Sequence, residues 1–154
     1  MFEVVEELMQ LTVAFRAAGI DYAVCGGLAV MIHGFIRATE DIELLIEEAD
    51  LDRARLVAAG CGFRLRGTQM TFRAGAKLAR IIKTSPDSED YLVLDLLLVT
   101  ETIRPAWESR ADLETQWGPI RTISREALKN MKRQAGRPQD LVDIERLENP
   151  DDFR

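Results

Sequence analysis

The sequence predicts a single α/β domain, and two observations support this prediction. Short apolar runs with the length and composition of strands alternate along the chain with segments whose apolar residues recur at helical spacing. The chain has 154 residues, of which 47% are hydrophobic. This is enough for one hydrophobic core and too little for two, so residues 1–154 are expected to form one domain.

The first three elements follow from periodicity and glycine positions. Phe2–Ala18 has apolar residues three and four positions apart, which predicts an amphipathic packing helix that Gly19 ends. Tyr22–Cys25 is a short apolar run typical of a buried strand. After two glycines, the pattern of Leu28–Phe35 is again helical. The order is therefore helix, strand, glycine turn, helix.

A pair of acids opens the next predicted strand, Asp41–Ile46. Residues two apart in a strand point to the same side, so Asp41 and Glu43 are expected to lie side by side. Neighbouring carboxylates repel each other unless a cation lies between them, and a divalent metal ion is the usual solution. The pattern is typical of a metal site, although an acidic pair of this kind can also be a solvated strand end.

The turn Gly26-Gly27 offers a second functional feature. A strand that turns through glycines into a helix presents free backbone N–H groups, which suit a phosphate group. A phosphate cradle facing a metal-binding carboxylate pair is typical of phosphoryl or nucleotidyl transfer. The alternative for the glycines alone is an ordinary turn.

A third acid, Asp95, stands alone in Tyr91–Val99, a strand that is apolar on both faces and is therefore predicted to be central. A buried carboxylate without a partner costs several kcal/mol, so Asp95 needs a cation, a metal ion or a raised pKa. The structural alternative is a carboxylate that pairs with a nearby arginine or a backbone amide.

The remaining elements are read from caps and turns. The sequence predicts a helix at Glu47–Ala59 with Asp50 as its N-cap and Gly60 as its stop, and two strands joined near Gly67-Thr68. Further expected elements are a loop at residues 85–88, a helix at 103–109, two short strands within 113–123 around Gly118-Pro119, and helices at 125–135 and 139–147. Ser124 is the expected N-cap of the helix at 125–135, and Leu141, Ile144 and Leu147 are expected to form the packing stripe of the last helix.

Gly26-Gly27 followed by Arg37-x-Thr39-x-Asp41-x-Glu43 resembles the pattern of the DNA polymerase β-type nucleotidyltransferase superfamily. The residue pattern is most similar to that of its minimal bacterial branch, which includes AbiEii-type toxin nucleotidyltransferases and antibiotic nucleotidyltransferases. The resemblance covers residues 20–100 as a core, and residues 124–147 also resemble the C-terminal tail of that branch in their sequence pattern. It implies a nucleotidyltransferase fold: a small mixed sheet with helices mainly on one face.

The resemblance also implies roles for individual residues. The catalytic and metal-binding carboxylates would be Asp41, Glu43 and Asp95, with Mg²⁺ or Mn²⁺ as cofactor. The nucleotide-binding residues would be Gly26, Gly27, Arg37, Thr39, Lys129 and Arg137. The implied reaction moves an NMP from an NTP to an acceptor hydroxyl and releases pyrophosphate. The acceptor would be tRNA or another RNA, a protein, or a small molecule.

The sequence departs from the superfamily in two respects. Glu43 stands where aspartate is the commoner choice, which moves the carboxylate about 1.5 Å further from the backbone. The chain is also short, so a partner protein or a homodimer is expected to supply the acceptor surface. Two alternatives follow: a catalytically degenerate module that binds a nucleotide or a toxin–antitoxin partner, and a structural domain whose acids pair with Arg37 and Arg73.

Two charged segments have both a functional and a structural interpretation. Gly62–Lys83 carries only positive charges, which could hold a triphosphate or a polynucleotide or could protect an exposed sheet edge. The basic residues are Arg64, Arg66, Arg73, Lys77, Arg80 and Lys83. In the tail, Lys129, Lys132, Arg133 and Arg137 precede Asp140 and Asp143, a pattern that is more often a solvated helix face.

Composition limits the remaining classes. The net charge of −6 argues against non-specific coating of nucleic acid. There is no apolar run near 18 residues and no signal-peptide pattern, so no membrane association is expected. Cys25 and Cys61 are expected to be reduced in a cytoplasmic protein. His33 is the only histidine and is expected to be a hydrogen-bonded core residue, which disfavours Ser/His/Asp or Cys/His catalysis.

Overall fold

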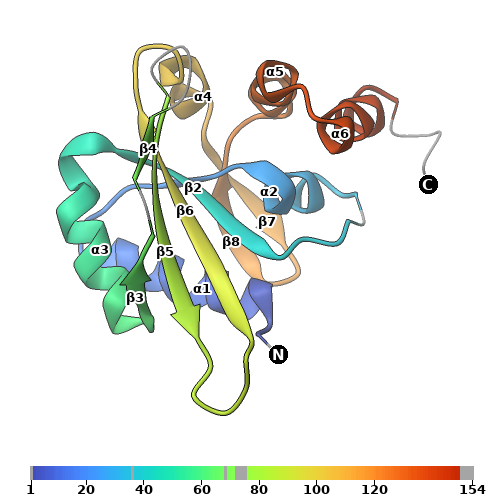
Figure 1. Cartoon of the computed structure of the whole chain (residues 1–154). Coiled ribbons are helices and arrows are strands. Elements are labelled where there is room, and N and C mark those ends of the chain that lie inside the picture. Colours follow the sequence, from blue (N-terminus) through green and yellow to red (C-terminus); the bar gives the residue numbers. More distant parts are fainter. Residues whose placement is uncertain (1, 36, 68, 72–75, 150–154) are drawn as a thin grey trace.

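A twisted mixed sheet runs through the centre of the molecule, with helices packed around it (Figure 1). The computed structural model describes residues 2–35, 37–67, 69–71 and 76–149. The helices are α1 (Val4–Ala17), α2 (Gly26–Ile32), α3 (Leu51–Gly60), α4 (Arg104–Glu108), α5 (Arg125–Ala135) and α6 (Pro138–Glu148), with a 3₁₀ turn at Glu48–Asp50. The strands are β1 (Ala23–Val24), β2 (Asp41–Glu47), β3 (Phe63–Arg66), β4 (Met70–Thr71), β5 (Lys77–Thr84), β6 (Tyr91–Val99), β7 (Ala111–Thr115) and β8 (Gly118–Thr122). The expected α/β fold with a mixed sheet is confirmed.

The centre of the sheet is the parallel pair β2–β6. The strand order is β3-β5-β6-β2-β1-β8-β7, and β4 pairs with β5 beside β3. On β6, Leu94, Leu96 and Leu98 are fully buried on one face, which explains why this strand reads as an almost continuous apolar run. The expectation of a central strand at Tyr91–Val99 is confirmed.

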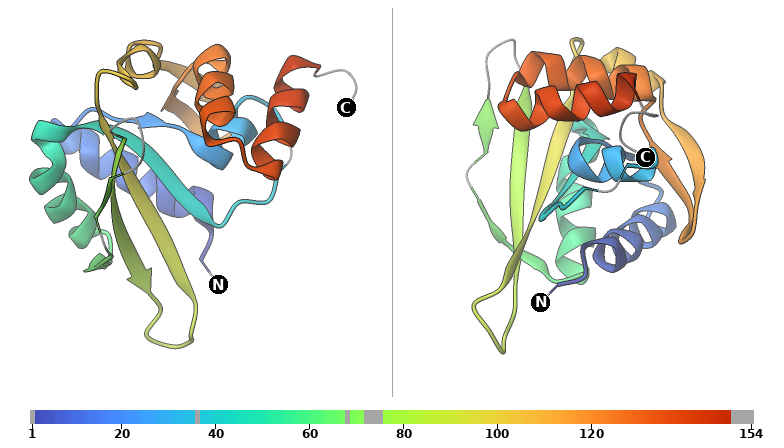
Figure 2. Two further views of the ribbon diagram at one scale, coloured as in Figure 1. Left: turned by 45° about the horizontal axis from the view of Figure 1, so that its top comes forward. Right: turned by 90° about the vertical axis from the view of Figure 1, so that its right-hand side faces the viewer.

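Helices α1 and α3 cover the face of the sheet to which Leu94, Leu96 and Leu98 belong, and they lie behind the strands in Figure 1. Helix α1 ends as expected: the N–H of Gly19 bonds to Arg16 O and the N–H of Ile20 bonds to Phe15 O, which is the pair of bonds that closes a helix through a left-handed glycine. Helices α5 and α6 lie side by side near α2 (Figure 2).

Strand β1 links two halves of the sheet although it is only two residues long. It pairs antiparallel with β2 through Ala23 and Val24, and parallel with β8 through Val24 and Thr122. The chain enters α2 directly after β1 and returns as β2, so the glycine turn and the acidic strand are brought together at one end of β1.

Several sequence predictions are corrected by the fold. Helix α2 begins at Gly26 rather than after the glycines. Strands β3 and β4 lie on either side of Gly67, as expected, and both pair antiparallel with β5, β3 through residues 81–83 and β4 through residues 77–78. Asp50 precedes α3, but its side chain accepts from Arg53 and caps no backbone N–H group.

The last helix faces differently from the expected packing stripe. Ile144 and Leu147 are buried as expected, whereas Leu141 is 58% exposed. The buried face of α6 is completed instead by Asp140 and Asp143, which pair with cations of neighbouring elements. Among the described residues, no helix is long and apolar enough to cross a membrane.

Candidate functional site

The three acids singled out by the sequence lie on adjacent strands. In the parallel pair β2–β6, Glu43 lies opposite Asp95 and Asp41 opposite Val93. Asp41 and Glu43 therefore share a strand face, as expected from their spacing. Burial raises the pKa of both carboxyl groups, and the nearby negative charge of Asp95 raises them further. The two acids thus form a site where negative charge is concentrated and incompletely compensated.

Asp95 has a partner of its own, Arg80 on β5. The antiparallel register places Arg80 directly opposite Asp95. The guanidinium donates from Nε to Asp95 Oδ1 at 2.8 Å and from Nη2 to Oδ2 at 3.0 Å. This bidentate pair raises the pKa of Arg80. It is the structural alternative that the sequence left open for the buried acid.

The position of Arg80 decides how the three acids are arranged. Both oxygens of Asp95 accept a hydrogen bond from Arg80. Within the part of the chain that the structure describes, no three histidine, cysteine or acidic side chains converge closely enough to hold a metal ion. Asp41 and Glu43 are the pair that remains available, since neither forms an ion pair with another described residue.

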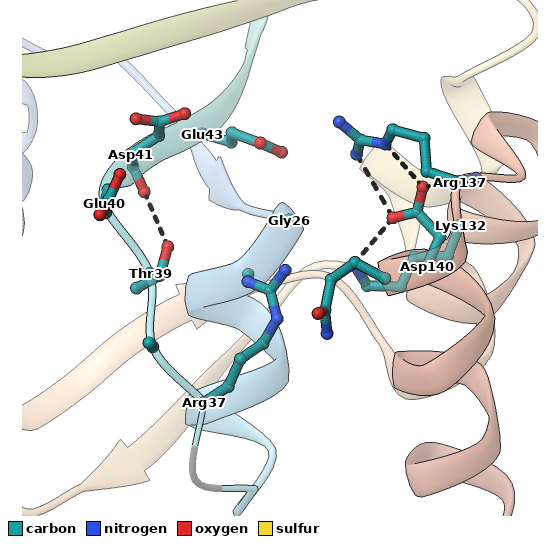
Figure 3. Close-up of a pocket in the computed structure, with 12 residues that line it drawn as sticks. Gly26, Arg37, Thr39, Glu40, Asp41, Glu43, Lys132, Arg137 and Asp140 are labelled. Carbon is teal, nitrogen blue, oxygen red and sulfur yellow. Dashed lines mark hydrogen bonds and ion pairs between the residues drawn. The ribbon is translucent and has the colours of Figure 1, made fainter.

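Beside this acidic pair is a cavity of about 370 Å³ (Figure 3). It lies between the start of β2, the glycine turn at the start of α2, and the ends of α5 and α6 that face each other. Its lining residues are Gly26, Gly27, Arg37, Ala38, Thr39, Glu40, Asp41, Glu43, Lys132, Arg137, Gln139 and Asp140. Carboxylates line one side and cationic side chains the other, so the cavity is polar and has two oppositely charged walls.

The glycines give the two walls room. Gly26 has a φ of +66°, and a Cβ added to it would fall on the carboxylate of Glu43. A Cβ added to Gly27 would fall on the guanidinium of Arg37. Only residues without a side chain let Glu43 and Arg37 come this close to the backbone. Thr39 donates its hydroxyl to the backbone oxygen of Asp41 at 3.3 Å, which braces the loop before β2.

The cationic side chains are paired with two buried acids on α6, of which Asp140 also lines the cavity. Asp143 lies 3.1 Å from Arg37 Nε and 2.9 Å from Lys132 Nζ. Asp140 accepts from the Nε of Arg137 at 2.7 Å and from its backbone N–H at 3.1 Å. Burial acts to raise the pKa of Asp140, but these hydrogen bonds outweigh it and the pKa is lowered. The expectation of a solvated charged face on this tail is therefore corrected: its acids are buried in an ion-pair network.

The structure brings most of the proposed site residues together. Residues lining the cavity are Gly26, Gly27, Arg37, Thr39, Asp41, Glu43 and Arg137. Asp95 adjoins the acidic pair but does not line the cavity, and Lys129 turns toward Glu126, 2.6 Å away. Sequence reasoning did not select Lys132, Gln139, Asp140 and Glu40. The acids three apart on α6, Asp140 and Asp143, followed a run of cations, and this was the available signal for a buried network.

The basic stretch after α3 is largely paired with acids. Lys77 pairs with Glu48, Arg80 with Asp95 and Lys83 with Glu7, at 3.1, 2.8 and 2.8 Å. The remaining described cations of this stretch, Arg64 and Arg66, are exposed on the edge strand β3, and Arg73 lies outside the described residues. This arrangement favours the structural interpretation of the stretch as a protected sheet edge.

His33 is hydrogen-bonded as expected, but it is half-buried at the end of α2 rather than in the core. The Nε2 atom of His33 lies 2.9 Å from Ile123 O, so the ring is used in packing α2 against the end of β8. Both cysteines are free, and burial raises the pKa of the fully buried Cys25. The structural alternative paired the acids with Arg37 and Arg73. For Arg37 this is wrong, because Arg37 pairs with Asp143 and not with an acid of β2.

Neither the protein-family models nor the curated proteins contain a match to this sequence. Solved structures do resemble it, and they define its fold as that of the nucleotidyltransferases. Among them is ANT(2")-Ia in complex with adenylyl-2"-tobramycin, with a TM-score of 0.63 and 17% identity over 96% of this chain and 88% of that one. The lincosamide antibiotic adenylyltransferase LnuA, bound to lincomycin, has a TM-score of 0.61 and 15% identity over 93% of this chain and 95% of its own.

A third structure, a candidate nucleotidyltransferase from Thermotoga maritima, has a TM-score of 0.61 and 11% identity over 96% of this chain and 93% of that one. The alignments cover most of both chains, because each of the three structures is also matched over most of its own length. The resemblance in fold expected from the sequence is confirmed, and it extends over the helical tail as well as the core.

Proposed function

We propose that the protein is a metal-dependent nucleotidyltransferase that moves an NMP from an NTP to an acceptor hydroxyl. The observation that carries this proposal is the two-walled cavity. Asp41 and Glu43 lie on one side, and Arg37, Lys132 and Arg137 lie on the other. A nucleoside triphosphate bound with a divalent cation has matching charges: its phosphates suit the cationic wall and its metal ion suits the acidic wall.

The donor set fits a divalent cation. Asp41 and Glu43 offer carboxylate oxygens, which Mg²⁺ and Mn²⁺ prefer, and their pKa values are raised first by burial and then by the negative charge of Asp95. Such an ion supplies charge neutralisation and polarisation of phosphoryl oxygens. Asp95 is the third candidate ligand, and each of its carboxylate oxygens already accepts one hydrogen bond from Arg80.

The residues of the chain would then do three things. Arg37, Lys132 and Arg137 bind phosphate oxygens, and the glycine turn lets the phosphates approach the backbone. The carboxylates of Asp41 and Glu43 would hold the divalent cation and so orient the phosphate groups bound to it. The acceptor oxygen bonds to the α-phosphorus, the bond from that phosphorus to the bridging oxygen of pyrophosphate breaks, and the hydroxyl proton passes to a nearby base or to solvent.

The acceptor is the finer part of the proposal. ANT(2")-Ia and LnuA are described with antibiotics, tobramycin as its adenylyl derivative and lincomycin. A small-molecule hydroxyl is therefore the first acceptor to test, ahead of RNA and protein. A partner protein or a second copy of the chain would supply any further acceptor surface.

A second function is favoured by one observation, the bidentate Arg80–Asp95 pair. If this pair persists when nucleotide binds, Arg80 neutralises the charge of the third acid and weakens its contribution to metal binding. The protein would then be a module that binds a nucleotide, or a toxin–antitoxin partner, without transferring a group.

The test is incubation with each α-labelled NTP and Mg²⁺ or Mn²⁺, with tobramycin, lincomycin or a cell extract as acceptor. Transfer of label by the wild type and not by Asp41→Asn supports the enzyme. Calorimetry with metal and NTP separates the alternatives: binding without transfer indicates the nucleotide-binding module, and absence of both metal and nucleotide binding contradicts the enzyme and the nucleotide-binding module.

A further inference from the structure

The acids on α6 are unusual because they are buried among cations that come from three different elements. Arg37 belongs to the connection from α2 to β2, Lys132 to α5, and Arg137 precedes α6. All three line the cavity, whereas Asp143 does not. Asp143 therefore contacts the cationic wall from the side away from the cavity.

Asp143 has no exposed side-chain surface, yet it is surrounded by donors. Its Oδ1 accepts a hydrogen bond from the side-chain amide of Gln139 at 3.0 Å. Its Oδ2 lies 2.9 Å from Lys132 Nζ and its Oδ1 lies 3.1 Å from Arg37 Nε, which are ion-pair distances without hydrogen-bond geometry. Burying a carboxylate this completely costs several kcal/mol unless it is paired. The two cations supply that pairing from separate parts of the chain, so one carboxylate fixes the position of both.

The cations need such a residue in the absence of a ligand. Arg37, Lys132 and Arg137 gather at one cavity wall, and like charges at short distance repel each other. Asp140, which itself lines the cavity, and Asp143, which does not, offset two of these three positive charges. Lys132 also lies 3.5 Å from Asp140 and so connects the two acids.

We infer that Asp143 is a positioning residue for polyphosphate binding: it holds Arg37 and Lys132 together, with their remaining N–H groups available to phosphate oxygens. This inference rests on the proposed function, because it assigns the cationic wall to the triphosphate of the NTP. The gain is preorganisation, since two flexible side chains are ordered before the ligand arrives.

A purely structural role for Asp143 would be to dock α6. That docking also depends on Leu147, which is buried on the same helix and lies outside the cavity lining. Loss of either residue is expected to lower the melting temperature. Only Asp143 is expected to change anion affinity, so Leu147→Ala is the matched control.

The experiment measures the dissociation constant of inorganic tripolyphosphate, and of each NTP with Mg²⁺, by calorimetry well below the melting temperatures. Asp143→Asn keeps the size of the side chain and removes its charge. We expect its tripolyphosphate affinity to fall by about tenfold or more, and that of Leu147→Ala to stay within about twofold. With a detected acceptor, KM for the NTP should rise more than kcat falls.

A second pair of variants covers the case in which Asp143→Asn does not fold. Lys132→Met combined with Asp143→Leu replaces a buried ion pair by apolar groups of similar size, which is often neutral for stability. In this double variant Arg37 has lost its carboxylate, whereas in Lys132→Met alone it has kept it. The double variant should therefore bind tripolyphosphate more weakly than the single one.

Three results overturn the inference. Equal affinity of Asp143→Asn and the wild type, or of the double and single Lys132 variants, shows that Asp143 positions nothing. An equal loss in Leu147→Ala shows that only the docking of α6 matters. If the wild type binds neither tripolyphosphate nor any NTP, the proposed nucleotide site itself is wrong. The first two results leave NTP binding by the wild type intact, so the two failures are distinguishable.

Discussion

Arg80 and Asp95 contribute unequally to their ion pair because their exposures differ. The Asp95 side chain is 5% exposed and that of Arg80 is 38% exposed. When one partner is removed, the arginine can turn toward water, but the carboxylate stays buried beside Glu43. The stability of the acidic face therefore depends more on Arg80 than on Asp95.

This asymmetry predicts the order of two variants. In EDTA, Arg80→Ala should lose about 3 kcal/mol or more of unfolding free energy, since it leaves a buried charge unpaired. Asp95→Asn should lose only about 1 kcal/mol, since the freed guanidinium is solvated. Denaturant melts of both variants measure the difference. Adding Mg²⁺ should raise the unfolding free energy of Arg80→Ala more than that of the wild type. The reverse order would contradict the inference that the buried charge of Asp95 depends on Arg80.

A second prediction at this scale concerns Asp41. Its pKa is raised by burial and by the charge of Asp95, so the charged form is disfavoured in the fold. Asp41→Asn should keep or slightly raise the melting temperature in EDTA, because a repelled charge is lost. Transfer activity should fall by about 100-fold or more, since charge stabilisation at the metal is worth several kcal/mol. Retention of most activity would remove Asp41 from the site.

Single residues were predictable from sequence where the reason is local. The alternation of one strand placed Asp41 and Glu43 on one face, and the apolar neighbours of Asp95 indicated its burial. The partner of Asp95 was not predictable, because Arg80 reaches it only through the register of β5 against β6. The burial of Asp140 and Asp143 likewise depends on how α6 meets α5 and the loop with Arg37, which no local pattern encodes.

The glycine turn at the start of α2 allows a test at the scale of an element. Gly26→Ala should cost about 1–3 kcal/mol, because its φ is +66° and the new Cβ would meet Glu43. It should also lower metal and NTP affinity by displacing that carboxylate. Gly60→Ala is the control: it lies at the end of α3 with nothing within 4 Å of the new Cβ, so a stability gain of up to about 1 kcal/mol is expected. Calorimetry and thermal melts measure both; equal NTP affinity in Gly26→Ala would exclude a close approach at the turn.

Elements were predicted best where caps are written in the sequence. Helix α5 begins after Ser124, whose Oγ accepts from the N–H of Ala127 at 3.1 Å, and ends at Gly136 in the left-handed conformation. The orientation of α6 was predicted less well. Leu141 was expected in the packing stripe of α6 but is exposed, because α6 is docked by ion pairs as well as by Ile144 and Leu147.

At the scale of the whole molecule, one surface ion-pair cluster joins segments far apart in the chain. Asp21, at the turn before β1, pairs with Arg110 after α4 at 2.9 Å and with Arg121 on β8 at 2.7 Å. Arg121 also pairs with Asp112 on β7 at 3.0 Å. The cluster therefore ties the N-terminal part of the sheet to its far edge.

This cluster predicts a pH dependence of stability. Burial acts to raise the pKa of Asp21, but hydrogen bonds from Arg121, Arg110 and the N–H of Tyr22 lower it below its ordinary value of 3.8. The folded state therefore binds this proton less readily than the unfolded state, so the stabilisation is present above pH 3.8 and is lost as the pH falls below it.

Asp21→Asn should consequently be less stable than the wild type at pH 7 by about 1 kcal/mol, a modest value because the side chain is 34% exposed and solvent screens the pair. The gap should narrow as the pH drops below 3.8. Urea melts across this range measure it, with Glu126→Gln as a control for an exposed pair on α5. A gap that is constant with pH would show that the charge of Asp21 does not contribute.

The shortness of β1 has a consequence for how the cavity walls can move. The acidic wall is on β2, and the cationic helices follow β8, so the backbone connection between them runs through Val24, its partner Thr122, and the bond from the N–H of Ile123 to Val24 O at 3.2 Å. This connection has one paired position between β1 and β8, whereas β2 and β6 pair over seven positions, so it is held by fewer backbone hydrogen bonds. The amide of Ile123 should therefore exchange with deuterated solvent faster than those of Leu94 and Leu96, and a polyphosphate that bridges the walls should slow it. The exchange rate of the Ile123 amide would then report whether the cavity is occupied, although Ile123 does not line the cavity.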